Sequence, residues 1–181
     1  MTKRMNLKCT SYSIRAQVSK PLKIAICSDL HDNSYAQALA LLTENKPDLI
    51  AIPGDIGENA NDLNGGGVAF MRACVPIAPT VYSLGNHDKY FNSNEAMADR
   101  IRKSGVILLD DEDIFMHDIW IGGLTSGFRD HKREGYFSAA PAPNLRWLDD
   151  VFCKREGFKL LLSHHQIKSY LLPVMFYQEQ P

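Results

Sequence analysis

The chain has 181 residues, 45% of them hydrophobic and 23% charged, with a formal net charge of −1 at pH 7. This length suits one domain over residues 1–181, and the balanced charge gives no nucleic-acid surface. The four cysteines form no C-x-x-C pair, which excludes a zinc knuckle and a thioredoxin-like motif. No secretory signal is visible, and no apolar run reaches the roughly 18 residues of a membrane span. We therefore expect a soluble, cytoplasmic protein.

The first half of the chain alternates between strand-like and helix-like patterns. The apolar runs at 22–27 and 48–55 are typical of buried strands. Residues 35–45 have helical spacing, with Ser34 as the expected N-cap, and Pro47 blocks continuation of that helix. The elements predicted in chain order are a strand at 5–17, a strand at 22–27, a helix at 35–45, a strand at 48–55, a helix at 68–75 and a strand at 79–88.

The second half continues the alternation, which indicates an α/β fold. A helix is predicted at 93–105, where Ser93 is the expected N-cap and Gly105 the stop. A second helix is predicted at 144–157 with Asn144 as its N-cap. The other predictions are a strand at 106–110, one or two strands around a turn at 113–124, a polar surface loop at 126–144 and a last strand at 158–165.

Polar loops that contain Asp, His or Asn follow the predicted strands. In α/β sheets, sites gather at the carboxyl ends of strands. Two residues spaced i and i+2 in an extended segment point to the same side, so Asp29 and His31 could share an ion. Gly54, just before Asp55, would let a ligand or ion approach closely. The loops together contain Asp29, His31, Asp55, Asn86, His87, Asp88, His164 and His165.

Each of these loops, taken alone, is also compatible with an ordinary turn or a solvated strand end. Their joint occurrence at the ends of apolar strands favours a metal site. Carboxylate, imidazole and amide ligands suit divalent manganese, iron or zinc, and the lack of cysteine ligands argues against structural zinc. A carboxylate between two clusters could bridge two ions, an arrangement known in phosphoryl chemistry.

The motifs D-L-H at 29–31, G-D-I-G-E at 54–58, G-N-H-D at 85–88 and L-S-H-H at 162–165 resemble those of the calcineurin-like metallophosphoesterases. This resemblance implies a four-layer α/β/β/α sandwich and two divalent metal ions, with manganese favoured over iron or zinc. It implies the following ligands: Asp29 and His31 for the first metal, Asp55 as the bridge, Asn86 for the second metal, and His164.

The resemblance also implies the catalytic residues and the reaction. His87 would stand beside the leaving group as a proton donor, with Asp88 orienting its ring. Hydroxide bridging the two metals would attack the phosphorus of a small phosphate monoester or diester in line. Gln166 stands where the family pattern usually has proline.

The family pattern has a fifth motif, G-H-x-H, which this sequence lacks. We therefore expect the C-terminal part of the second sheet to be missing, with self-association covering an exposed sheet edge. The alternative function is a weakly active or inactive remnant that serves as a metal-binding or interaction module.

Overall fold

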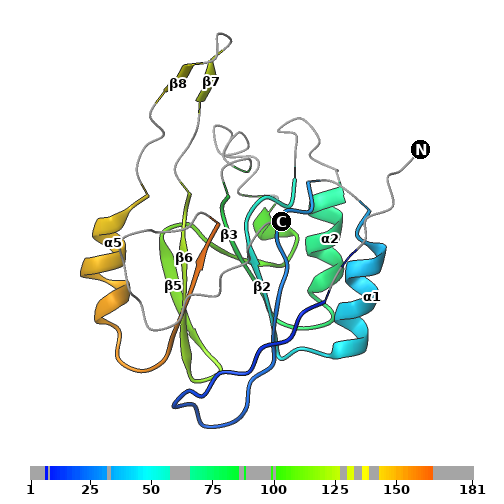
Figure 1. Ribbon diagram of the computed structural model, residues 1–181, viewed down its shortest axis with the longest axis horizontal. Coiled ribbons are helices and arrows are strands. Elements are labelled where there is room, and N and C mark those ends of the chain that lie inside the picture. The colour runs from blue at the N-terminus through cyan, green and yellow to red at the C-terminus, as the bar shows by residue number, and fades with distance from the viewer. Residues whose placement is uncertain are drawn as a thin grey trace.

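A computed structural model of the chain describes residues 7, 9–31, 34–57, 66–85, 88, 99, 101–126, 130–132, 136–138 and 143–164, with the backbone alone at 130–132 and 136–138. Two sheets lie face to face between helices (Figure 1). None of the helices in these ranges is long and apolar enough to cross a membrane.

The first sheet, here called sheet A, has four parallel strands in the order β1-β2-β3-β4. Two helices connect its first three strands, and Pro47 follows soon after the first helix ends, as predicted. The elements are β1 (Ile24–Ile26), α1 (Ala36–Asn45), β2 (Leu49–Pro53), α2 (Gly66–Cys74), β3 (Thr80–Ser83) and β4 (Ile107–Leu109).

The second sheet, sheet B, has the order β5-β6-β9, with β5 antiparallel and β9 parallel to the central strand. The turn predicted within residues 113–124 is present: His117 and Asp118 connect β5 and β6, and both have positive φ. The elements are β5 (Glu112–Met116), β6 (Ile119–Leu124), the hairpin strands β7 (Asp130–Lys132) and β8 (Tyr136–Ser138), α5 (Leu145–Asp150), the 3-10 helix η1 (Phe152–Lys154) and β9 (Lys159–Ser163).

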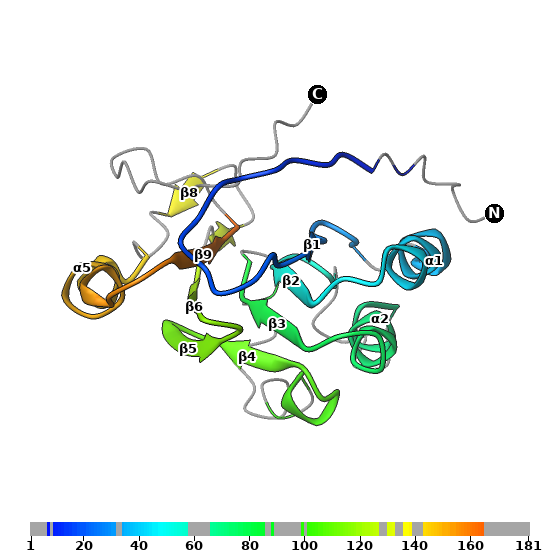
Figure 2. The ribbon, with the colours of Figure 1, turned by 90° about the horizontal axis from the view of Figure 1, so that it is seen from below.

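Alternation along the strands of sheet A separates two cores. Ile50 and Ile52 of β2 pack in the core with α1 and α2, whereas Leu49 and Ala51 pack in a second core with strands of sheet B. All four are at most 1% exposed, as expected for a strand covered on both faces. Figure 2 shows α1 and α2 on the outer side of sheet A and α5 beside sheet B. The predicted α/β fold, with a parallel sheet and a second sheet, is confirmed.

Two glycines in β6 let neighbouring layers approach sheet B closely. A Cβ on Gly122 would lie 2.5 Å from Cε2 of Phe152, on the side of α5. A Cβ on Gly123 would lie 2.5 Å from Cβ of Leu109, on the side of sheet A. Side chains at these two positions would push the layers apart, so glycine here is a packing requirement.

Several sequence predictions are wrong or only partly tested. Residues 9–17 form no strand and are exposed, because their alternation finds no partner strand in the described chain. The predicted loop at 126–144 contains the β7–β8 hairpin. Tyr35, not Ser34, precedes α1 and makes no side-chain cap. Of the helix predicted at 93–105, residues 99 and 101–103 are helical, and Ser93 lies outside the described residues.

Candidate metal centre

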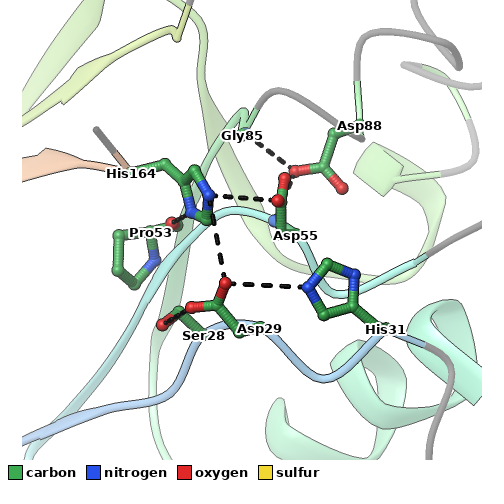
Figure 3. Close-up of polar contacts among 8 residues, drawn as sticks. All are labelled: Ser28, Asp29, His31, Pro53, Asp55, Gly85, Asp88 and His164. Atoms are coloured by element: carbon green, nitrogen blue, oxygen red, sulfur yellow. Dashed lines mark hydrogen bonds and ion pairs between the residues drawn. The ribbon is translucent and has the colours of Figure 1, made fainter. Parts of the chain in front are cut away.

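Three side chains from three different strand ends meet at one edge of the fold. Asp29 follows β1, Asp55 follows β2 and His164 follows β9, and one ligand atom of each lies within 4.8 Å of the others. Nε2 of His164 lies 3.0 Å from Oδ2 of Asp55 and 4.0 Å from Oδ1 of Asp29. Figure 3 shows Asp29 between His164 and His31, whose Nε2 lies 3.7 Å from the same oxygen.

The D-x-H segment is a turn and not the extended segment predicted from its spacing. Asp29 has φ 57° and His31 has φ 46°, in the left-handed region, where Asp and His are among the better-tolerated residues. The turn is tied to the next loop because Asp29 N–H donates to Gly54 O at 3.5 Å and His31 N–H donates to Asp55 O at 3.2 Å. Asp29 and His31 therefore face the same site, as predicted, but from a left-handed turn instead of an extended segment.

Ser28 orients the carboxylate of Asp29. Its hydroxyl donates to Oδ2 of Asp29 at 2.5 Å, which leaves Oδ1 facing the two imidazoles. A hydrogen bond to an anionic oxygen is stronger than one between neutral groups, so this contact helps to fix the orientation of the Asp29 carboxylate. Ser28 was not predicted as a site residue, although a hydroxyl residue directly before the first aspartate was a signal.

Gly54 and Gly85 allow the two chain segments that contain them to approach each other closely. A Cβ on Gly54 would lie 2.5 Å from both Cα and N of Gly85. A Cβ on Gly85 would overlap the carboxylate of Asp55 and lie 2.8 Å from its backbone nitrogen. The missing side chain at Gly54 therefore permits the close approach of Gly85, and the approach of an ion at Gly54 stays a prediction.

Asp88 is buried behind the site at 1% exposure and holds backbone amides. Its Oδ2 accepts hydrogen bonds from the N–H groups of Asp55 and Gly85, both at 2.8 Å. Burial raises the pKa of Asp88 above its usual value, even though hydrogen bonds from Tyr82 and from these two amides act in the opposite direction. Its predicted contact with His87 lies outside the described residues.

The two nitrogens of His164 have different environments. Nδ1 lies 3.0 Å from the carbonyl oxygen of Pro53, which can only accept, so Nδ1 carries a proton. When the ring is neutral, the Nε2 lone pair faces the Asp55 carboxylate. Because both groups are electron-rich, their close contact requires positive charge between the nitrogen and the carboxylate oxygen. Burial alone lowers the pKa of His164, but the hydrogen bond with Asp55 and the charges of Asp55 and Asp29 outweigh burial and raise it.

This arrangement fits a divalent cation. Two ligands about 2.1 Å from one ion lie roughly 3.0–4.2 Å apart, depending on the angle between them. The separations of 3.0 and 4.0 Å from His164 to the two carboxylates lie in that range. The backbone carbonyl on Nδ1 is the usual partner of a metal-binding histidine, because it fixes the tautomer and ring orientation.

The structure brings together most of the predicted residues that it describes. Asp29, Asp55 and His164 form the cluster, and His31 borders it. Asp88 supports the cluster indirectly, because its carboxylate accepts a hydrogen bond from the backbone N–H of Asp55. The predictions for Asn86, His87 and His165 lie outside the described residues.

The profile of the calcineurin-like phosphoesterases matches residues 22–175, most of the chain, and this range includes every residue of the cluster. The chain belongs to the calcineurin-like phosphoesterase family. As a member of that family, it is also similar to the Escherichia coli (strain K12) protein named phosphodiesterase YaeI, with 32% identity over 100 residues. The match covers 49% of this chain and 36% of that protein, so the chain spans about a third of this relative's length.

Proposed function

We propose that the chain binds two divalent metal ions and hydrolyses a small phosphate monoester or diester. The observation that carries this proposal is the convergence of Asp29, Asp55 and His164 at the strand ends of a calcineurin-like phosphoesterase. The similarity to a phosphodiesterase supports ester hydrolysis. Manganese is favoured over iron or zinc, although the mixed oxygen and nitrogen donors suit all three. The proposed compartment is the cytoplasm.

The ligands would divide between the two ions as the family resemblance implies. Asp29 and His31 would hold the first ion, Asn86 the second, and Asp55 both, with His164 completing the set. When bound, two such ions lower the pKa of a shared water and polarise the phosphoryl oxygens. The chain itself supplies rigid ligands: Asp55 is 2% exposed, and its amide is fixed by Asp88. Little reorganisation would therefore be needed when an ion binds.

His87 is proposed to donate a proton to the leaving oxygen, because an alkoxide is a poor leaving group at neutral pH. His87 follows Gly85 by two residues in the sequence. Gly85 and Asp88, which flank His87 in the sequence, are hydrogen-bonded to each other, and Asp88 also accepts from the amide of Asp55. These contacts support a role for His87 near the cluster.

The test is metal content together with hydrolysis of an aryl phosphate and a bis-aryl phosphate in manganese. Asp55→Ala should lose both metal and activity, whereas His87→Ala should keep metal and lose activity. Glu44→Gln, an exposed acid on α1, is the matched control and should change neither. Unchanged activity in both site variants would refute the assignment. Tight metal binding without any hydrolysis would support the non-catalytic metal-binding module instead.

Self-association is proposed as a way to cover a sheet edge. Within the described residues β9 is the last strand of sheet B, with a neighbour in β6 alone. A strand edge of this kind can pair with a second chain. Sedimentation velocity over a range of concentrations should show a dimer, and a monomer at every concentration would exclude it.

A further inference from the structure

Tyr82 is a polar residue in an apolar layer. It lies at the centre of β3 with 1% exposure, in the core that joins sheet A to the helices. A phenylalanine would fill nearly the same volume. A hydroxyl that is removed from water costs free energy unless it is hydrogen-bonded, so its partners indicate why it is there.

The hydroxyl of Tyr82 has a donor on one side and an acceptor on the other. It accepts a hydrogen bond from the backbone N–H of Ile56 and donates one to the carboxylate of Asp88. Asp88 in turn accepts from the N–H groups of Asp55 and Gly85 at 2.8 Å. Tyr82 and Asp88 together therefore hold the amides on both sides of the Asp55 Cα.

The backbone at Asp55 needs this support. Asp55 has φ 55°, a conformation that costs free energy in residues other than glycine and persists where the surroundings fix it. Rotation of either flanking peptide would swing the carboxylate, whose Oδ2 lies 3.0 Å from Nε2 of His164. The preceding peptide is held by Asp88 and the following one by Tyr82.

We propose that Tyr82 is a positioning residue of the metal centre: its hydroxyl, through the Ile56 amide and the Asp88 carboxylate, sets the orientation of the Asp55 carboxylate. The proposal rests on the proposed function, because it concerns a metal ligand assigned there. It assigns Tyr82 no contact with the metal or substrate.

The decisive variant is Tyr82→Phe, which removes the hydroxyl and keeps the ring. Mn²⁺ binding is measured by titration calorimetry, and the visible spectrum of bound Co²⁺ reports the ligand geometry. The expected result is a dissociation constant about tenfold higher, the lower end of the range for residues that orient metal ligands. The Co²⁺ spectrum should also change. An unchanged constant and an unchanged spectrum would overturn the proposal.

Two controls separate positioning from general destabilisation. Val81→Ala removes volume from the neighbouring residue of the same strand, which packs in the opposite core with sheet B. Tyr35→Phe removes another tyrosine hydroxyl, from a ring that packs on Phe70 beside α1. Both should bind Mn²⁺ like the wild type. A loss in Val81→Ala as large as that in Tyr82→Phe would show that Tyr82 acts through stability alone.

A second variant tests the path through Asp88, even if Tyr82→Phe does not fold. Asp88→Asn should also weaken Mn²⁺ binding, and the double variant should bind about as weakly as Asp88→Asn alone, because residues in one network are not additive. Unchanged affinity in Asp88→Asn, or additive losses in the double variant, would overturn the proposal. A wild-type chain that binds neither Mn²⁺ nor Co²⁺ would instead refute the proposed function.

Discussion

Nε2 of His164 lies 3.0 Å from Oδ2 of Asp55. The opposite nitrogen of the ring is protonated, because it lies 3.0 Å from the carbonyl oxygen of Pro53. The space between the imidazole and the carboxylate therefore suits positive charge, which either a proton on Nε2 or a metal ion can supply. This competition between a proton and a metal ion underlies the first two predictions.

The first prediction is that metal binding depends on pH through His164. Its pKa is raised above 6.5 in the metal-free protein, and the ring must lose a proton to bind a metal ion. The affinity for Mn²⁺ should rise as the pH increases through this raised pKa, by up to about tenfold per pH unit, and then level off. Calorimetric titrations from about pH 6 to about pH 8 measure it. His117→Gln, at the β5–β6 turn, is the control and should keep the dependence; a flat profile in the wild type would contradict the prediction.

The second prediction concerns the stability of the metal-free protein. Because folding raises the pKa of His164, its charged form stabilises the fold fully below the unfolded value of about 6.5, and this stabilisation is lost as the pH rises through the folded pKa. Urea unfolding in the presence of a chelator should show lower stability at about pH 8 than at about pH 6. Asp55→Asn removes the negative partner and should reduce this difference. A difference of equal size in Asp55→Asn would exclude the pair as its source.

The third prediction uses the contact between two loops. A Cβ on Gly85 would overlap the Asp55 carboxylate and lie 2.8 Å from its backbone nitrogen, so Gly85→Ala must displace that carboxylate, a proposed metal ligand. We expect a loss of about 1–3 kcal/mol in stability, as for other overpacked sites, together with loss of Mn²⁺ binding. Gly157→Ala is the control: it meets nothing within 4 Å, but its φ of +92° strains the backbone. It should cost stability of about 1 kcal/mol and keep metal affinity. Normal metal binding by Gly85→Ala would contradict the predicted displacement.

The fourth prediction concerns the start of α5, which contributes no residue to the cluster. Oδ1 of Asn144 accepts a hydrogen bond from the N–H of Trp147 at 3.1 Å at the start of α5. Asn144→Ala should lower the free energy of unfolding by about 1 kcal/mol, and Asn144→Asp should retain most of it. Mn²⁺ affinity should stay the same in both variants. Equal unfolding free energies for wild type and Asn144→Ala would show that the cap contributes nothing.

The sequence was sufficient where the local chemistry decides the structure. The N-cap at Asn144 and the strands β1 to β4 were predicted correctly, because caps and apolar runs are properties of adjacent residues. The predicted cap at Ser34 was wrong: Tyr35 precedes the helix, and its ring packs on Phe70. A contact with a residue distant in the chain is not visible in local spacing.

The candidate site shows the same division. Asp29, Asp55 and His164 were predicted from their positions after apolar strands, and they converge because those strand ends share one edge of the fold. The left-handed turn at Asp29 was not predictable from the spacing, because it depends on hydrogen bonds to the neighbouring loop. Tyr82 was missed because an aromatic residue in a strand is ordinarily core, and its hydrogen bonds appear only in three dimensions.

Asp29, Asp55 and His164 are proposed to form a metal centre. Calorimetric titration of the metal-depleted chain with Mn²⁺, for the wild type and Asp55→Asn, tests it most directly. Asn has nearly the same shape as Asp but no negative charge, so the variant should fold and bind more weakly by more than about 100-fold, beyond the loss typical of residues that orient ligands. Saturable binding in the wild type with this loss in the variant is the predicted result. Equal affinities in the two chains, or no saturable binding in the wild type, would contradict it.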